Sequence, residues 1–170
     1  MPTYIALLRA VNVGGTGKLN MTDLKALCAE LGLRRIETYI ASGNVIFDSD
    51  MAAAKVQTQL ERRLLMEMGK SVSVFVRSAA EMQNIVKRNP FTDKEPKHTY
   101  TWFLDEKPLS EALDDVRGRA GEEMHLGQRE IYVWYPKGMG QSKLQISAAR
   151  LGTARNMNTV AKLVEMSDRN

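Results

Sequence analysis

Two short polar stretches hold the residue types that could do chemistry in this sequence. The first runs from Arg9 to Lys18 and contains Asn12 and glycines at positions 14, 15 and 17. The second is Ser42-Gly43-Asn44, which places a hydroxyl, a bare backbone and an amide side by side. Cations, amides and glycine-freed backbone N–H groups are the donors with which proteins bind anions, phosphate groups among them.

The known nucleotide-binding loops do not fit the first stretch. A Walker loop requires glycine five residues before Gly17 and Ser or Thr after Lys18, where this sequence has Asn12 and Leu19. A dinucleotide-binding loop that starts at Gly15 requires glycine at position 20, which is Asn20. Two plainer interpretations stay open: the glycines only turn the chain from a strand into a helix, and Ser42-Gly43-Asn44 is only a hairpin turn.

The other titratable residues indicate no catalytic or metal site, and we expect no metal and no cofactor. Cys28 falls on the apolar face of its predicted helix and should be buried as a small hydrophobic residue. His98 and His125 lack metal-ligand spacing to each other or to the cysteine. The acidic pairs Asp114-Asp115 and Glu122-Glu123 are typical of solvated faces.

Composition describes a globular protein of 170 residues, of which 44% are hydrophobic, enough to bury a core. The longest apolar run, residues 4–8, is far shorter than the roughly 20 residues that span a bilayer, so we expect no membrane association and no export signal. The single cysteine agrees with a reducing cytoplasm. A net charge of +4 and a pI near 9.2 favour anionic partners slightly.

The elements that must position the polar stretches follow the order β-α-β-β-α-β over residues 3–77. An apolar strand at residues 3–9 is followed by a helix over 21–31, which Asn20 caps and Gly32 ends. Strands 36–40 and 44–48 form a hairpin, in whose turn Gly43 and Asn44 are expected to adopt positive φ.

A longer helix and a strand complete this first half. Ser49 or Asp50 is expected to cap the helix and Gly69 to end it. The alternation of Val72, Val74 and Val76 then predicts a half-buried strand.

This order predicts a split βαβ, or ferredoxin-like, α-β plait. In such a sheet the spatial strand order is 4-1-3-2, so the first and third strands are antiparallel neighbours. The end of the first strand, with Arg9 and Asn12, should therefore lie beside Ser42, Gly43 and Asn44. The fold class that we predict is α+β, with two plait subdomains in tandem.

The second half repeats the pattern less regularly. A capping box, Ser78 and Glu81, opens a helix that Asn89-Pro90 ends, and residues 89–97 are a linker. We then expect a strand at 98–104, a helix at 110–117, strands at 122–126 and 130–135, and a last helix over 156–166 with Thr153 as a cap. We expect no closing strand after residue 145.

This pattern divides the chain into a first plait at residues 1–77, a helix and linker at 78–97, and an irregular second plait with C-terminal helices at 98–170. Aromatic residues alternate on two strands of the second plait, where core or cross-strand pairing is favoured over base stacking: Tyr100, Trp102, Tyr132 and Trp134.

The sequence resembles a bacterial family, the domain of unknown function 1697, over nearly its whole length. The matching segments are residues 7–15, Lys18 with Met21 and Leu24, residues 38–47, Asn89-Pro90-Phe91, and residues 153–159 with Lys162-Leu163. Ala10, Ala41 and Met157 depart from the family pattern, which has glycine, glutamine and tryptophan there. The resemblance implies a fold of two plait-like subdomains and no particular activity.

The function that the sequence favours is binding of a phosphate-bearing ligand, a nucleotide or nucleic acid, at the shared sheet edge. The residues expected to bind it are Arg9, Asn12, Gly14, Gly15, Lys18, Ser42, Gly43 and Asn44, completed by Arg155, Asn156 and Lys162 from the last helix region. An enzyme that acts on a small anionic substrate is an alternative, although no obvious acid or base falls at this edge. An oligomerisation module is another alternative.

Overall fold

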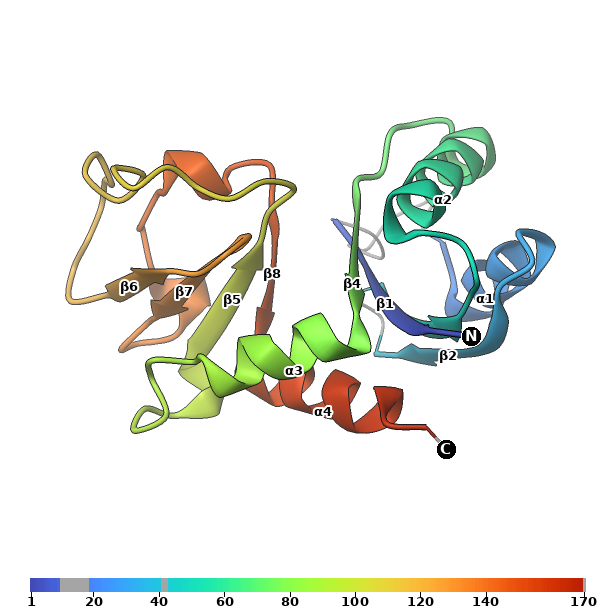
Figure 1. The fold of residues 1–170 in the computed structure, drawn as a ribbon. Coiled ribbons are helices and arrows are strands. Elements are labelled where there is room, and N and C mark those ends of the chain that lie inside the picture. The colour runs from blue at the N-terminus through green and yellow to red at the C-terminus, as the bar shows by residue number, and fades with distance from the viewer. Residues whose placement is uncertain (10–18, 41–42, 170) are drawn as a thin grey trace. The chain divides into compact units, whose positions relative to one another are not determined.

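The computed structural model describes residues 1–9, 19–40 and 43–169, and it contains two four-stranded antiparallel sheets and four α-helices (Figure 1). The chain divides into two compact units. The first unit comprises Met1–Gln83 with Leu163–Asn170, and the second comprises Asn84–Lys162. The chain therefore passes from one unit to the other within each of two helices, α3 (Ala79–Lys87) and α4 (Met157–Ser167).

The sheet of the first unit has the strand order β2-β3-β1-β4, which is the predicted order 4-1-3-2 read from the other edge. Its elements, in chain order, are β1 (Thr3–Leu8), α1 (Met21–Glu30), β2 (Arg34–Tyr39), β3 (Asn44–Asp48), α2 (Ala53–Met68) and β4 (Val74–Ser78). Every neighbouring pair of strands is antiparallel. The predicted β-α-β-β-α-β order of this half is confirmed.

One face of this sheet packs with α1 and α2 around a continuous apolar core, whose buried members include Leu8, Phe47, Leu24, Leu60 and Val76. Cys28 is fully buried in this core, as predicted, and burial raises the pKa of its thiol to about 12.

The other face of the sheet is also buried, which the alternation of valines in β4 did not predict. Phe75 lies between Val74 and Val76, Arg77 follows Val76, and the two are only 2% and 1% exposed. The half-buried interpretation of this strand was wrong because period-two alternation reports only one face. The second face is covered by packing that no local pattern indicates.

Local signals place most helix ends of the first unit. Asn20 accepts a hydrogen bond from the backbone N–H of Asp23 at 2.7 Å, and Gly32 and Gly69 adopt positive φ at the ends of α1 and α2. Ser78 and Glu81 form the predicted capping box, with bonds of 3.1 and 2.8 Å.

The start of α2 differs from the prediction. Ala52 is its N-cap and makes no side-chain cap bond. The hydroxyl of Ser49 instead accepts from the backbone N–H of Met51 at 3.1 Å, so Ser49 closes a local turn and does not cap the helix.

The hairpin between β2 and β3 was predicted correctly, but its turn differs in detail. Gly43 has φ +81°, as expected. Asn44 is the first residue of β3, and among the described residues of the turn Ile40 also has a positive φ, +47°. The β-strand pairing of Asn44 with Leu7 holds its backbone extended and overrides its preference for turns.

The sheet of the second unit has the order β6-β7-β5-β8, which is arranged like the first. Its strands are β5 (Thr99–Phe103), β6 (Glu123–Leu126), β7 (Glu130–Trp134) and β8 (Thr153–Asn156). The expectation that no strand closes this sheet was wrong, because β8 pairs antiparallel with β5 from Thr153 to Asn156. The strand is short and polar, so its β structure depends on a partner some fifty residues away and not on its own alternation.

The helix predicted for residues 110–117 is absent. The chain there forms successive turns, with bonds from Ala112 N–H to Leu109 O and from Asp114 N–H to Glu111 O, both 3.0 Å. Short 3₁₀ turns occupy Pro96–His98, Met139–Gln141 and Ser147–Ala149.

The cap of α4 also differs from the prediction. Thr153 begins β8 and does not cap the helix. Asn156 supplies the cap instead, accepting from Thr159 N–H at 2.9 Å.

Tyr100 and Trp102 pack against the apolar core of the second unit, and Tyr132 is buried. Tyr100 packs edge-on against Tyr135 with ring centroids 5.5 Å apart, and the indole N–H of Trp102 donates to the Tyr135 hydroxyl at 3.0 Å. The hydroxyl of Tyr132 donates to the Ile85 carbonyl at 2.7 Å. Trp134 is partly buried, and the ammonium of Lys94 lies 4.2 Å from its ring centroid.

Glu122 is buried, and its assignment to a solvated face was wrong. It is 3% exposed, and its carboxylate accepts from the Ser142 hydroxyl at 2.6 Å and from the backbone N–H of Ala120. Burial by itself raises the pKa of Glu122, but these hydrogen bonds and the charge of Arg119 outweigh it and leave the pKa lowered. The carboxylate thus ties together two loops that the sequence does not mark as neighbours.

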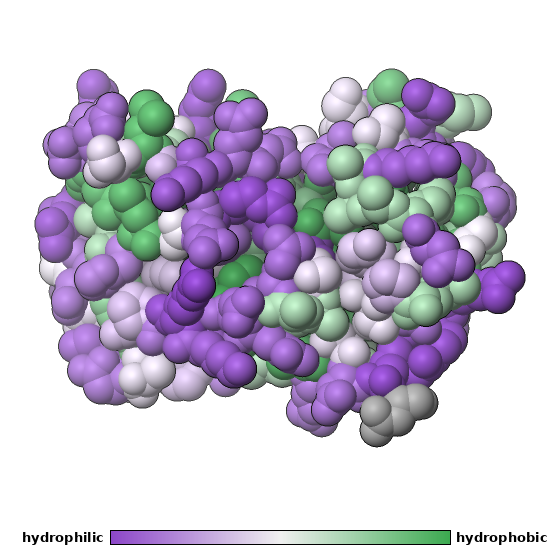
Figure 2. Space-filling model, viewed as in Figure 1, coloured by the Kyte–Doolittle hydropathy of each residue, from purple (hydrophilic) through white to green (hydrophobic). Residues whose placement is uncertain are grey.

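The face shown in Figure 2 mixes hydrophilic and hydrophobic residues. Large apolar side chains that are more than half exposed include Met66, Leu109 and Leu151. In the described part of the chain, no helix combines the length and the apolar character needed to cross a membrane.

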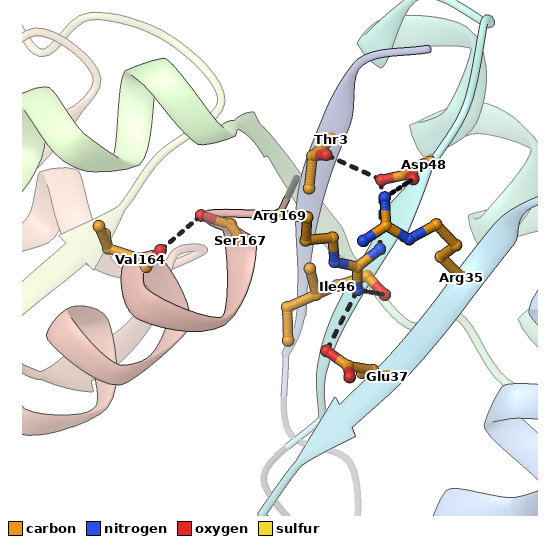
Figure 3. Close-up of polar contacts among 8 residues, drawn as sticks. All are labelled: Thr3, Arg35, Glu37, Ile46, Asp48, Val164, Ser167 and Arg169. Carbon is orange, nitrogen blue, oxygen red and sulfur yellow. Dashed lines mark hydrogen bonds and ion pairs between the residues drawn. The ribbon is translucent and has the colours of Figure 1, made fainter.

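An ion-pair cluster fastens the C-terminal residues to the first sheet (Figure 3). The Arg169 guanidinium lies 3.2 Å from a carboxylate oxygen of Asp48 and 3.3 Å from one of Glu37. Asp48 also accepts from the Thr3 hydroxyl at 2.8 Å and pairs with Arg35 at 3.3 Å. The Arg169 and Asp48 side chains are only 6% and 7% exposed, so the central pair is shielded from solvent.

This cluster predicts a difference between two arginines that share one carboxylate. Arg169→Ala should lower the free energy of unfolding by about 2 kcal/mol or more, because it removes a buried charged partner of Asp48. Arg35 has a side chain that is 54% exposed, so Arg35→Ala should cost below about 1 kcal/mol. Urea denaturation of both variants measures the difference, and equal losses would contradict it.

The lowered pKa of Glu122 predicts a contribution to acid stability. A carboxyl whose pKa is lower in the folded protein stabilises it above the unfolded pKa, about 4.3, and loses this effect as pH falls through the folded value. Glu122→Gln should therefore lower stability at neutral pH and show a smaller further loss on acidification than wild type. Denaturant titrations at pH 7 and about pH 3 measure this. The exposed Glu106→Gln is the control and should follow wild type at both values.

Candidate functional site

The C-terminal end of β1 and the β2–β3 hairpin turn meet at one end of the strands of the first sheet; this is the place predicted from the sequence as the shared sheet edge. Leu7 pairs with Asn44 in the β1–β3 ladder, and the backbone N–H of Leu8 donates to the Gly43 carbonyl at 2.9 Å. The N–H of Arg9 donates to the Ser73 carbonyl, also at 2.9 Å. The structure therefore brings Arg9, Gly43 and Asn44 together, as the strand order predicted.

Five of the predicted site residues lie outside the described residues: Asn12, Gly14, Gly15, Lys18 and Ser42. On both sides of the first gap the chain is anchored. Arg9 is hydrogen-bonded at the sheet edge, and Leu19, 4% exposed, belongs to the core of the first unit.

The Asn44 side chain supports the hairpin from inside. It is fully buried, and its amide N–H donates to the Tyr39 carbonyl at 3.0 Å, across the base of the turn. Gly43 uses its carbonyl to bind Leu8 and requires the positive φ that glycine adopts without strain. Both residues therefore have a structural role in shaping the turn.

Positive charge comes from the described residues on both sides of the first gap. Arg9 supplies a full positive charge beside the turn. α1 begins at Met21 after the Asn20 cap, and the free N–H groups of its first turn carry a partial positive charge. Asp23, in the first turn of the same helix, offsets part of that potential.

The three remaining predicted residues lie on β8 and α4, in the second unit. The Arg155 guanidinium donates to the Thr153 hydroxyl at 2.7 Å and to the Ala154 carbonyl at 3.0 Å. Burial of Arg155 lowers its pKa to about 10. The side chain of Asn156 caps α4, and Lys162 is half-buried on that helix. Their participation in a site with Arg9 stays a prediction.

Metal ligands do not gather in the part of the chain that the structure describes, since no group there of three or more His, Cys, Asp or Glu side chains could hold an ion. The buried thiol of Cys28, with its raised pKa, is a poor nucleophile.

Sequence reasoning missed the hollows of the second unit. One, of 250 Å³, is lined by Glu122, Tyr135, Lys137, Ser142 and Lys143 among others. Another, of 310 Å³, lies between the residues that follow α3 and the β6–β7 hairpin. Both hollows lie between segments that are distant in sequence, which sequence reasoning does not bring together. The only local signals near them are the Gly-rich loop after residue 135 and the Asn89-Pro90-Phe91 turn.

Comparisons with known proteins agree with this fold. The chain is similar to a solved structure described as the conserved bacterial protein SP0830 from Streptococcus pneumoniae, with a TM-score of 0.80 and 22% identity. The match covers 98% of this chain and 99% of that one. At this level of identity the likeness shows the fold alone. The comparison with curated proteins finds no match.

The family comparison covers most of the chain. The family model described as "Protein of unknown function (DUF1697)" matches residues 1–132 of the 170. This range includes the end of β1, the hairpin and the Asn89-Pro90-Phe91 turn. The chain therefore belongs to the DUF1697 family.

Proposed function

We propose that the protein binds a phosphate-bearing ligand, a nucleotide or a stretch of nucleic acid, at the sheet edge where β1 ends beside the β2–β3 hairpin. The observation that carries the proposal is the position of Arg9, one residue beyond the bond from Leu8 to Gly43 and itself bonded to Ser73. The backbone of Arg9 is held to the sheet at this point, so the side chain starts from a fixed position beside the turn, and a guanidinium can make paired hydrogen bonds to phosphate oxygens.

The polar residues near Arg9 in sequence supply further groups that could bind phosphate. Asn12, Gly14, Gly15 and Lys18 follow it before α1 begins, and Ser42 precedes Gly43 in the hairpin. Backbone N–H groups at glycines, a second cation and the start of a helix are a recurrent combination for phosphate groups. The net charge of +4 favours the approach of such an anion.

We infer further that both units are ferredoxin-like α-β plaits, the first complete and the second irregular, with turns in place of its first helix. The shared strand order, β2-β3-β1-β4 and β6-β7-β5-β8, supports this inference. The sequence division at 1–77, 78–97 and 98–170 is proposed as the repeat boundary. We place the protein in the cytoplasm, on the ground of its single cysteine.

Charge removal at Arg9 tests the proposed site. Wild-type protein and Arg9→Ala are titrated with ATP, GTP and short single-stranded RNA and DNA, and binding is followed by calorimetry or fluorescence anisotropy. A charge-assisted bond contributes about 1.5–3 kcal/mol, so Arg9→Ala should weaken binding of the ligand that wild type prefers about tenfold or more.

Arg34→Ala is the matched control. It removes the same charge from the same sheet, but Arg34 begins β2 and pairs with Asp48, at the end of the strands opposite the turn. The affinity of Arg34→Ala for the ligand that wild type prefers should stay within about twofold of the wild-type value. If wild type binds none of these ligands, or if Arg9→Ala and Arg34→Ala weaken binding equally, this edge is not the site.

A further inference from the structure

The 310 Å³ hollow of the second unit gathers polar side chains that no function described so far uses. Its lining includes Arg88, Pro90, His125, Gln128 and Tyr132. These residues come from the end of α3, from the turn after it, and from the two strands and turn of the β6–β7 hairpin. All of them belong to residues 84–162.

Tyr132 organises the hollow. It lies directly opposite His125 in the β6–β7 ladder, so the two side chains share one face of the sheet. Its hydroxyl donates to the Ile85 carbonyl of α3 at 2.7 Å, which holds the helix end against that face. Arg88 follows Ile85 by three residues, about one helical turn, and so reaches the same hollow.

The imidazole of His125 is held by packing. The ring of Phe91, 4% exposed, meets it edge-on with centroids 5.4 Å apart and planes at 63°. Phe91 is itself fixed by a turn in which its N–H donates to the Asn89 side chain at 2.9 Å. Pro90, which lines the hollow, lies between Asn89 and Phe91, so a locally set turn holds this part of the lining.

Gly127 allows the hairpin turn to approach Tyr132. A Cβ at this position would lie 3.2 Å from the Tyr132 ring and 3.2 Å from the Glu130 carbonyl oxygen, closer than side chains normally pack. The glycine N–H donates to that carbonyl at 2.7 Å and closes the turn. Gln128, the next residue, is thus held at the mouth of the hollow.

We propose that this hollow binds the phosphate group of a small phosphate monoester. Three of the residues that line it, Arg88, His125 and Gln128, carry side chains that can donate hydrogen bonds, and a phosphate group accepts several such bonds at once. Burial raises the pKa of Tyr132, so the floor of the hollow stays neutral. The neighbouring acid Glu130 is 6% exposed and opposes the anion, and Arg88 offsets it.

The two histidines of the chain allow a direct test by NMR. Inorganic phosphate is added to the full-length protein at constant pH, and the ring C–H signals of His125 and His98 are followed, with sodium chloride at matched ionic strength as the reference titration. His98 belongs to the same unit but does not line the hollow, and its side chain is 28% exposed. A saturable shift of His125 alone, produced by phosphate and not by chloride, is expected.

Neighbouring cations provide matched variants. Arg88→Gln should weaken the phosphate response of His125 about tenfold or more, because it removes a charged donor from the hollow. Lys87→Gln removes the same charge one residue earlier, from the exposed end of α3. It should change the phosphate response of His125 less than about threefold. An unchanged His98 signal verifies that each variant keeps its fold.

Three results would overturn the proposal: no shift at His125, a parallel shift of both histidines, or equal weakening by Arg88→Gln and Lys87→Gln. The proposal does not rest on the site at the β1 edge. Arg9→Ala should retain the full response of His125 to phosphate, so failure of one proposal leaves the other standing.

Discussion

The register of β1 is the constraint on which the candidate site depends. This strand lies between β3 and β4, and its residues from Ile5 to Leu8 are fully buried. A slip by one residue would turn every one of its side chains to the opposite face of the sheet, so the burial of both faces holds the register firmly. Because Leu7 faces Asn44 in this register, Arg9 emerges beside the hairpin turn and beside Ser73.

The two units share a buried arginine at the same place in their sheets. Arg77 on β4 pairs with Ile5 on β1, and Arg155 on β8 pairs with Thr101 on β5. Each guanidinium is buried and donates to the carbonyl of the residue before it, at 3.3 and 3.0 Å. The next residue, Ser78 or Asn156, caps the helix that follows. A buried arginine followed by an N-cap thus ends the outer strand of both sheets.

Buried charge in this protein is handled through several partners at once. Asp48 is bound by Thr3, Arg35 and Arg169, and Glu122 by Ser142 and Ala120. Removing a carboxylate from water is costly, and these hydrogen bonds compensate for the lost hydration. Both carboxylates also join segments far apart in sequence, so each restrains loops or a terminus that short-range bonds would leave loose.

The sequence by itself determined the features that depend on residues within one helical turn of each other. Both ends of α1, the C-terminal end of α2 and the capping box of α3 follow from Asn20, Gly32, Gly69 and the Ser78–Glu81 pair, because caps are local hydrogen bonds and local backbone preferences. The strand order of the first unit follows from the order of its elements, since short connections allow few topologies.

Only the tertiary structure decided the features whose partners are distant in sequence. β8 is a strand because β5 offers it an edge, Glu122 is buried because Ser142 reaches it, and Arg169 is fixed because Asp48 lies at the end of β3. No periodic pattern in the sequence indicates such contacts. Two residues far apart in sequence stabilise the fold through their contact only once the chain between them has folded. For that reason the hollow around Tyr132 could not be predicted from the residues that line it.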